Sequence, residues 1–315
     1  MSAILCIKNL EKSYKDSKAV DVISFEVQKG EILCILGPNG AGKSTTINMM
    51  TGALSCDGGE IHSTFSGGQD IHKELTKYKR RLGIVPQDLA IYEDLTAAQN
   101  VQFFASLYGM KGNELNQRSN YALEFVGLLD RARDKAKTFS GGMKRRLNIA
   151  CAIAHNPDLL FMDEPTVGID PQSRNHILDF IKRLRDEGKT IIYTTHYMEE
   201  VEVISTRIII LDHGKIIATG TSEELKENMD TEKMTLIEAS ELDSFDADEL
   251  YGIEGVKHVE NTGGRLEVTT IRNIENLDRI ITILIEHGMK ISSITTQVIS
   301  LETVFLNLTG RSLRD

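Results

Sequence analysis

The 315-residue chain has only four cysteines, and no two of them form a CxxC pair. Cys6, Cys34, Cys56 and Cys151 lie far apart, which argues against a disulfide framework and against a zinc site. A reducing cytosol fits this pattern better. We expect Cys34, inside the apolar run Ile32–Leu36, to fill a small buried position.

The sequence also lacks any uncharged apolar run approaching the ~20 residues that a membrane-spanning helix requires. Residues Met1–Leu10 alternate as a β-strand does and contain no apolar core like that of a secretory signal peptide. We therefore expect the chain to be soluble by itself, so that any role at a membrane depends on a partner protein.

A surplus of basic residues is missing as well. The formal net charge is −10, from 36 Lys+Arg and 46 Asp+Glu. Residues 222–315 carry 9 basic and 19 acidic side chains, whereas residues 1–221 carry 27 of each. The whole net charge therefore lies in the last third of the chain. Because DNA or RNA binding needs a basic face, we expect no nucleic-acid partner.

The order of the apolar segments predicts an α/β fold. Ile32–Leu36 and Leu159–Met162 are short continuous apolar runs, typical of strands buried on both faces of a mainly parallel sheet. Between Leu95 and Ala154 the apolar spacing becomes helical. This change predicts a helical subdomain at about residues 95–155, inserted into a first domain of residues 1–221.

A small α+β domain is expected at residues 222–315. Ser222 and the two acids after it form a plausible helix start, with a capping hydroxyl and first-turn carboxylates. Leu266–Thr270 and Ile291–Ile299 read as strands. Between them, one face of an amphipathic helix that ends at Gly288 is marked by Ile274, Leu277, Ile280, Ile281, Leu284 and Ile285.

A phosphate-binding loop follows the first buried strand. Gly40 and Gly42 let successive N–H groups turn toward phosphate oxygens, and the next helix adds its positive N-terminal end. Lys43 is placed to reach the β- and γ-phosphates, and the Ser44 hydroxyl to ligate Mg²⁺. The motif, G-x-x-x-x-G-K-S between a strand and a helix, predicts nucleoside triphosphate binding by Gly37, Pro38, Asn39, Gly40, Ala41, Gly42, Lys43, Ser44 and Thr45.

Two carboxylates end the second apolar strand. Asp163 can hold the Mg²⁺ shell, directly or through water. Glu164, the next residue, can polarise the attacking water as a general base, an effect of roughly 10²–10⁴-fold. Asp163 and Glu164 therefore predict hydrolysis of the bound triphosphate.

Ser140, Gly141 and Gly142 open a further helix, in the segment Thr-Phe-Ser-Gly-Gly-Met-Lys-Arg-Arg. A hydroxyl, two N–H groups and a helix N-terminus form another anion site. The segment resembles the signature of ATP-binding cassette (ABC) proteins. We expect the basic run after it, Lys144–Arg146, to be a solvated helix face.

The resemblance implies a dimer, because in this family the signature faces the γ-phosphate bound by the other subunit. The partner cassette is either a second copy or a related chain. Gln87 looks like the family's Q-loop glutamine, which reaches the Mg²⁺ and the attacking water. His196 looks like the switch histidine that contacts the γ-phosphate, and Gly168–Asp170 like the loop that crosses the dimer interface. Tyr14 matches the aromatic side chain that stacks on adenine.

The resemblance covers residues 3 to about 220, with every expected motif in order. Glu164–Pro171 and Ser300–Arg311 are in addition similar to the ATPase subunits of ABC-2-type exporters, a group linked to efflux of drugs, antibiotics, sodium or lipid-like molecules. This implies an ATPase, using ATP and Mg²⁺, at the cytoplasmic face of the cell membrane, where it powers a separately encoded integral membrane permease. A soluble ABC protein acting on ribosomes or DNA, and a drug-binding or regulatory module without transport, remain alternatives.

One segment copies the signature at a second place. Thr64–Gly68 repeats its first five letters but precedes a polar stretch with no apolar helical stripe. We expect a structural turn there.

Overall fold

The computed structural model describes residues 2–15, 17–229, 232–240, 242, 245–262, 264–271, 274–297 and 300–309. The chain divides into two compact units, one of Met1–Ser222 with Leu308–Asp315 and the other of Glu223–Asn307. Each unit has its own sheet structure and its own hydrophobic core.

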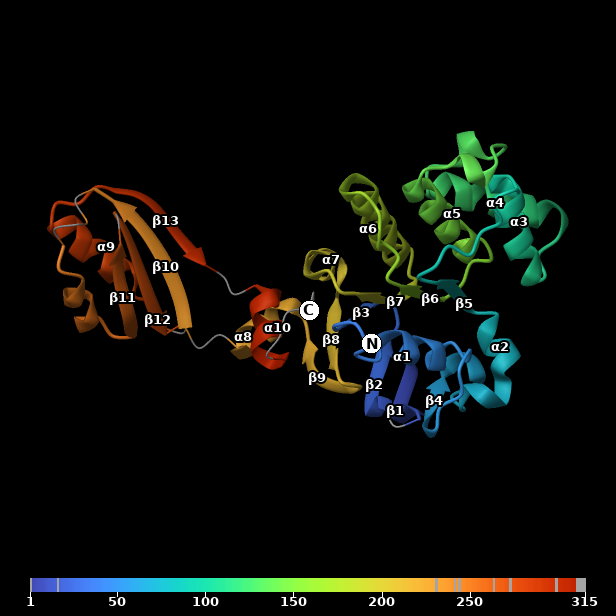
Figure 1. Cartoon of the computed structure of the whole chain (residues 1–315), viewed down its shortest axis with the longest axis horizontal. Coiled ribbons are helices and arrows are strands. Elements are labelled where there is room, and N and C mark those ends of the chain that lie inside the picture. The colour runs from blue at the N-terminus through green and yellow to red at the C-terminus, as the bar shows by residue number, and fades with distance from the viewer. Residues whose placement is uncertain are drawn as a thin grey trace. The chain divides into compact units, whose positions relative to one another are not determined.

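The first unit is built on a six-stranded sheet (Figure 1). In sheet order its strands are β5 (Leu82–Val85), β6 (Leu159–Asp163), β7 (Thr190–Thr195), β3 (Ile32–Leu36), β8 (Arg207–Asp212) and β9 (Lys215–Gly220). The strands from β5 to β8 pair in parallel, and β9 returns antiparallel at the edge. Every residue of β3 is buried, including Cys34, as its apolar sequence predicts. The parallel order brings the carboxyl ends of β3, β6 and β7 to one edge, where a ligand site is expected.

A second, antiparallel sheet has the order β2-β1-β4, with bounds Ser17–Gln28, Ala3–Tyr14 and Gly58–Ser63. It shares one core with the six-stranded sheet and with α1 (Lys43–Met50). The side chains in that core include Leu5, Ile7, Ile23, Leu33, Ile35, Ile47, Phe161 and Ile192.

Three helices lie between β5 and β6 in the sequence: α3 (Ala97–Leu107), α4 (Gly112–Phe125) and α5 (Gly141–Ile153). Figure 1 shows them gathered beyond the β5–β6 end of the sheet. The start of α3 is fixed by a capping box, in which Thr96 and Gln99 each accept a hydrogen bond from the other's backbone N–H. Further α-helices of this unit are α2 (Leu75–Lys79), α6 (Pro171–Asp186) and α7 (Met198–Ile204).

The second unit contains a four-stranded antiparallel sheet in the order β11-β12-β10-β13. The bounds are Val256–Thr262, Arg265–Ile271, Glu232–Ala239 and Ile291–Gln297. One face packs on α9 (Leu277–Glu286), because alternate strand residues point to the same side. This core includes Ile237, Leu266, Val268, Ile280 and Leu284. Helices α8 (Ser222–Met229) and α10 (Leu301–Thr309) flank the sheet in the sequence.

The predicted fold class is confirmed: an α/β cassette with helices inserted between two strands, followed by a small α+β part. Two details differ. Ile274 does not lie on the predicted amphipathic helix, because α9 begins only after Asn276. The predicted strand ends in β13 at Gln297, and Ile299 lies outside the described residues.

Candidate active site

The phosphate loop joins β3 to α1 through unusually close backbone contacts. Gly40 and Gly42 have φ angles of +80° and +102°, which side-chain-bearing residues rarely adopt. A Cβ atom at Gly42 would lie 2.2 Å from the carbonyl oxygen of Ala19. At Gly37 it would lie 2.3 Å from that of Leu211. Gly37 and Gly42 are therefore required by packing, and Gly40 and Gly42 by backbone conformation.

The side chain of Lys43 is buried between this loop and the end of β6. Its Nζ donates to the carbonyl oxygens of Gly37 at 2.8 Å and Pro38 at 3.2 Å. It also lies 3.3 Å from Oε1 of Glu164. The other carboxylate oxygen of Glu164 lies 3.1 Å from Nδ1 of His196. The Glu164 carboxylate thus bridges the phosphate-loop lysine and the residue that follows β7.

Thr194, which was not predicted from the sequence, forms hydrogen bonds with both Asp163 and Glu164. Its hydroxyl donates to Oδ1 of Asp163 at 2.5 Å and accepts the N–H of Glu164 at 3.0 Å. Glu164 has a φ of +45°, a conformation that costs a non-glycine residue about 1–3 kcal/mol. Thr194 stabilises this conformation because it lies opposite Asp163 in the parallel β6–β7 pair. Sequence spacing alone does not reveal that pairing.

Lys43 and Glu164 line a pocket of about 280 Å³. Its lining comes from β1, β2, the phosphate loop, the segment after β5 and the end of β6. The lining residues are Tyr14, Ala19, Asn39, Gly40, Gly42, Lys43, Ser44, Thr45, Gln87 and Glu164. Ala19 was not predicted. The structure therefore brings Tyr14, the phosphate loop, Gln87 and Glu164 around one hollow, with Tyr14 half exposed. His196 and Asp163 do not line it, although His196 contacts Glu164.

The signature residues begin α5, and none of them lines this pocket. The Ser140 hydroxyl accepts the N–H of Met143 at 3.3 Å, which leaves its own hydrogen available to an acceptor. Ser140 and Gly141 are exposed. Gly142 is buried, and a Cβ there would lie 2.3 Å from Oγ of Ser173 in α6. Gly142 thus allows two helices to pack closely, which the sequence analysis did not foresee.

The basic run after the signature was predicted to be solvated, and this is wrong for Arg145. Its side chain is 5% exposed, and its guanidinium donates to the carbonyl oxygens of Pro86 at 3.0 Å and Gln87 at 2.7 Å. Burial lowers the pKa of Arg145 from its ordinary value. Arg146 is also engaged, donating to the carbonyl oxygen of Val126 at 3.0 Å. Arg145, which lies on α5 after the signature, therefore holds the backbone of Pro86 and Gln87 in place.

The second copy of the signature letters forms a turn, as predicted. Thr64–Ser66 is a single 3₁₀ turn after β4, and Gly67 and Gly68 have φ angles of +67° and +79°. Ser66 is 3% exposed. Since no α-helix begins there, the copy has no helix N-terminus to offer to a phosphate.

Gly214 forms backbone hydrogen bonds with both the phosphate loop and β2. Gly214, in the turn between β8 and β9, donates its N–H to the carbonyl oxygen of Ala41 at 3.0 Å. Its own carbonyl oxygen accepts the N–H of Asp21, in β2, at 2.8 Å. The phosphate loop and the antiparallel sheet are thus bonded to the same residue.

The residues present fit a magnesium ion. Ser44, Gln87 and Asp163 offer hydroxyl, amide and carboxylate oxygens, the hard donors that Mg²⁺ prefers. Within the described part of the chain, no group of three or more His, Cys, Asp or Glu side chains could hold a metal by itself. A mixed donor set completed by phosphate oxygens is the usual arrangement for Mg²⁺.

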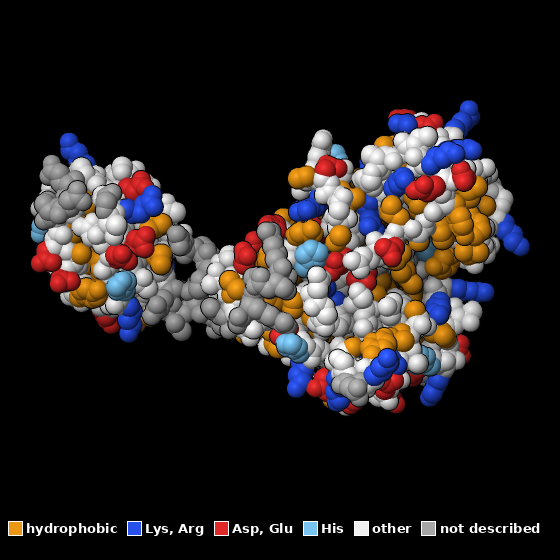
Figure 2. Space-filling model, in the orientation of Figure 1, with side chains coloured by type: hydrophobic (Ala, Val, Ile, Leu, Met, Phe, Trp, Pro, Cys, Tyr) orange, Lys and Arg blue, Asp and Glu red, His pale blue; other side chains and the backbone are white. Residues whose placement is uncertain are grey.

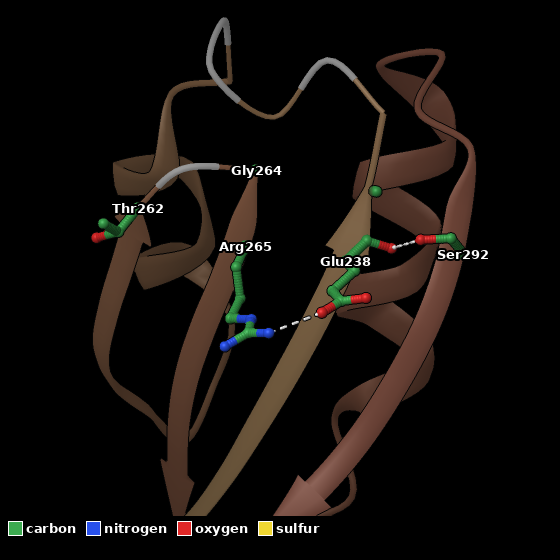
Figure 3. A pocket seen from close by; sticks show the side chains of 6 residues that line it. Glu238, Thr262, Gly264, Arg265 and Ser292 are labelled. Atoms are coloured by element: carbon green, nitrogen blue, oxygen red, sulfur yellow. Dashed lines mark hydrogen bonds and ion pairs between the residues drawn. The ribbon is translucent and has the colours of Figure 1, made fainter.

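A hollow of about 360 Å³ in the second unit has a different character (Figure 3). Arg265 of β12 and Glu238 of β10 face each other across it at 2.9 Å, and Ser292 donates to the carbonyl oxygen of Glu238 at 3.0 Å. Both charged side chains are about half exposed and neutralise each other. Its described lining holds none of the residues predicted from the sequence to bind or hydrolyse a nucleotide.

Known proteins show the same organisation. A family profile described as "ABC transporter" matches residues 20–167. A second, "ATP-binding protein DrrA1-3-like, C-terminal domain", matches residues 220–309. The chain is 45% identical over 318 residues to "Linearmycin resistance ATP-binding protein LnrL" of Bacillus subtilis (strain 168), which covers 99% of this chain and 100% of the relative. The chain belongs to the ABC transporter family.

A second relative and a solved structure support the same family. "Daunorubicin/doxorubicin resistance ATP-binding protein DrrA" of Streptomyces peucetius is 36% identical over 97% of this chain and 92% of its own length. The solved dimeric cassette MJ0796, in a post-hydrolysis state bound to ADP and Pi, is 29% identical. It superposes with a TM-score of 0.63 over 69% of this chain and 98% of its own. The predicted family, its ABC-2-type subgroup and the ATPase activity are confirmed. None of the helices in the described part of the chain combines the length and the apolar composition that a transmembrane span requires.

Proposed function

We propose that this ABC ATPase holds two Mg–ATP between two cassettes, hydrolyses them and thereby powers an exporter whose membrane path is a separate permease. The observation that carries this proposal is the Glu164 carboxylate, which lies between Lys43 Nζ and His196 Nδ1 beside the phosphate loop. In this assignment residues 1–221 are the cassette, with a helical subdomain at about 95–155. Residues 222–315 are an accessory domain that does no chemistry.

The buried ion pair suggests how ATP prepares the site. Phosphate oxygens entering the loop compete with Glu164 for Lys43, because they carry more negative charge. Glu164 then keeps only His196, whose Nδ1–H orients the carboxylate, and can accept a proton from the attacking water. Mg²⁺, held by Ser44, Asp163 and Gln87, would neutralise charge on the phosphates.

The exposed signature supports a two-chain site. Ser140 and Gly141 lie at the surface and do not line the pocket of their own chain. An exposed helix N-terminus with a free hydroxyl hydrogen can bind an anion carried by another molecule. We assign it to the γ-phosphate held by a second copy or by a related cassette. The dimeric state of the related cassette MJ0796 agrees with this assignment.

An apolar hollow offers a place for the permease. It measures about 330 Å³, and its lining includes Ile84, Pro86, Phe104, Leu107 and Cys151. Leu107 is 66% exposed, and Figure 2 shows hydrophobic side chains gathered on this helical part of the cassette. Docking here would hold the chain at the cytoplasmic face of the membrane. Pro86 lines this hollow and the next residue, Gln87, lines the nucleotide pocket, so docking of a partner at Pro86 could shift Gln87.

The proposal is tested with Glu164→Gln, which keeps the shape of the side chain but removes the base. ATP binding should persist, hydrolysis should fall roughly 10²–10⁴-fold, and an ATP-bound dimer should accumulate in gel filtration. Glu199→Gln, at an exposed position of α7, is the matched control. Wild-type turnover by purified, folded Glu164→Gln would overturn the assigned chemistry. Co-purification of a permease with the wild-type chain tests the transport partner separately.

A further inference from the structure

Glu200 is a buried carboxylate beside the active site that the proposed chemistry does not use. It lies on α7 and is 1% exposed. Its Oε1 accepts the Thr166 hydroxyl at 2.5 Å and lies 3.5 Å from Nε of Arg174. Its Oε2 accepts the hydroxyls of Tyr193 at 2.8 Å and Thr195 at 2.7 Å. Burying a carboxylate costs folding free energy unless both of its oxygens accept hydrogen bonds. In Glu200 both oxygens do so, from three hydroxyl groups.

Two of these donors belong to segments that carry proposed catalytic groups. Thr195 directly precedes His196, and Thr166 follows Glu164 by two residues. Both hydroxyls meet on the one carboxylate of Glu200. The segment after β6 and the end of β7 are therefore linked through Glu200, close to the His196–Glu164 contact.

A second path runs through aromatic contacts. The guanidinium of Arg174 lies 4.4 Å from the ring centroid of Tyr197, and that ring lies 4.2 Å from the ring of His196. The N–H of Tyr197 donates to the Thr195 hydroxyl at 3.0 Å. The residues on either side of His196 thus both belong to the network that ends on Glu200.

We propose that Glu200 is a positioning residue that fixes His196 relative to Glu164, chiefly through Thr195 and Thr166. This inference rests on the roles proposed above for His196 and Glu164. A displacement of about 1 Å at a reacting group can cost about 10²-fold in rate. Since the phosphates are bound by the phosphate loop, loss of Glu200 lowers kcat and leaves the KM for ATP nearly unchanged.

Glu200→Gln tests this in the full-length protein, by phosphate release at varied ATP. The amide keeps one acceptor oxygen and the side-chain volume, while Arg174 loses its anionic partner. We expect kcat to fall about tenfold or more and KM to stay within about twofold. Glu199→Gln makes the same chemical change at the exposed neighbour and should alter neither. A Glu200→Gln enzyme with wild-type kcat, or with a lower melting temperature but unchanged kcat per folded molecule, refutes the proposal.

A second pair of variants separates positioning from stability. Thr195→Val and Tyr193→Phe each remove one hydroxyl donor to the same oxygen of Glu200, at 2.7 and 2.8 Å. Only Thr195 adjoins His196. Thr195→Val also removes the acceptor of the Tyr197 N–H, so kcat is compared per folded molecule, and we expect a clearly larger fall of kcat in Thr195→Val. Equal kcat values in the two variants contradict a path through Thr195.

Failure of this inference can be told from failure of the proposed function. His196→Ala and Glu164→Gln report on the function. If both lose turnover while Glu200→Gln and Thr195→Val keep it, only the role of Glu200 is wrong. If His196→Ala and Glu164→Gln keep wild-type turnover, the proposed chemistry is wrong as well.

Discussion

The signature can be tested at Gly141 without disturbing the fold. An acid at Gly142 would fail for an unrelated reason, because a Cβ there lies 2.3 Å from Oγ and 2.7 Å from Cβ of Ser173. Even alanine at that position overpacks α5 against α6, at a cost of about 1–3 kcal/mol. At Gly141 nothing lies within 4 Å of an added Cβ. Gly141→Asp therefore adds a carboxylate to the start of α5 with no clash.

Charge repulsion sets the expected size of the effect. At about 4 Å and an effective dielectric constant of about 20, two like unit charges repel by about 4 kcal/mol. This corresponds to roughly a 10³-fold weaker ATP-driven dimer for each site that faces an altered signature. Within its own chain, the new carboxylate at a helix N-terminus is favourable by about 0.3–1 kcal/mol. Gly141→Asp should therefore keep the stability of the single chain and lose only the closed dimer.

The measurement is best made in the Glu164→Gln background, where hydrolysis does not consume the complex. Light scattering with ATP reports dimer formation, and a fluorescent nucleotide reports binding to the single chain. Stability is followed by circular dichroism, because the chain contains no tryptophan.

Gly141→Ala controls for the loss of glycine. Gly68→Asp adds an acid to the copied turn, where φ is +79° and aspartate is among the better tolerated residues. An undiminished ATP dimer in Gly141→Asp, or its loss in folded Gly68→Asp, would show that the wrong copy or the wrong role was chosen.

Two further variants test buried groups. Arg145→Lys keeps the charge but loses the fork that reaches Pro86 and Gln87, a loss of about 1.5–3 kcal/mol for one charged hydrogen bond. Its kcat should fall and its Mg²⁺ requirement rise, whereas a wild-type Mg²⁺ titration contradicts the link to Gln87. Burial lowers the pKa of His155 to about 4, against about 6.5 when unfolded, so the unfolded chain binds more protons and stability is lost as pH falls between these values. Urea unfolding should show about 2 kcal/mol lost between pH 7 and pH 5 in the wild type, and His155→Phe should lack that component.

Local patterns predicted the phosphate loop, two buried strands and the signature helix, because each of these is specified within a few residues. The phosphate loop needs glycines with positive φ next to an apolar strand, and this signal is contained in Gly37–Thr45. The same holds for the helix that opens at Ser140. Prediction was weaker at the edges of elements, such as Ile274, where one apolar residue continues a helical spacing although the chain is still in the loop before Asn276.

Contacts between distant segments could not be predicted. Thr194 lies beside Asp163 only because β7 is the neighbour of β6, a pairing that follows from the topology of the whole sheet. Arg145 and Glu200 each have charged neighbours in the sequence, a pattern that is typical of solvent-exposed side chains. Their burial is decided by carbonyl and hydroxyl partners that are 58 and 34 residues away in the sequence. Charge at a position therefore predicts exposure poorly wherever the fold supplies partners of opposite polarity.

The hydrogen bonds of Gly214 restrict movement of the phosphate loop relative to β2. Because its backbone is bonded to Ala41 and to Asp21, the phosphate loop and β2 cannot move apart here without breaking at least one of these two hydrogen bonds. We therefore expect the phosphate loop and β2 to move together. Movement that couples ATP to a partner is then expected at side-chain contacts, such as the hydrogen bonds from Arg145 to Pro86 and Gln87. A coupling variant is therefore best sought in the helical insert, while a change at the β8–β9 turn would loosen the grip on ATP itself.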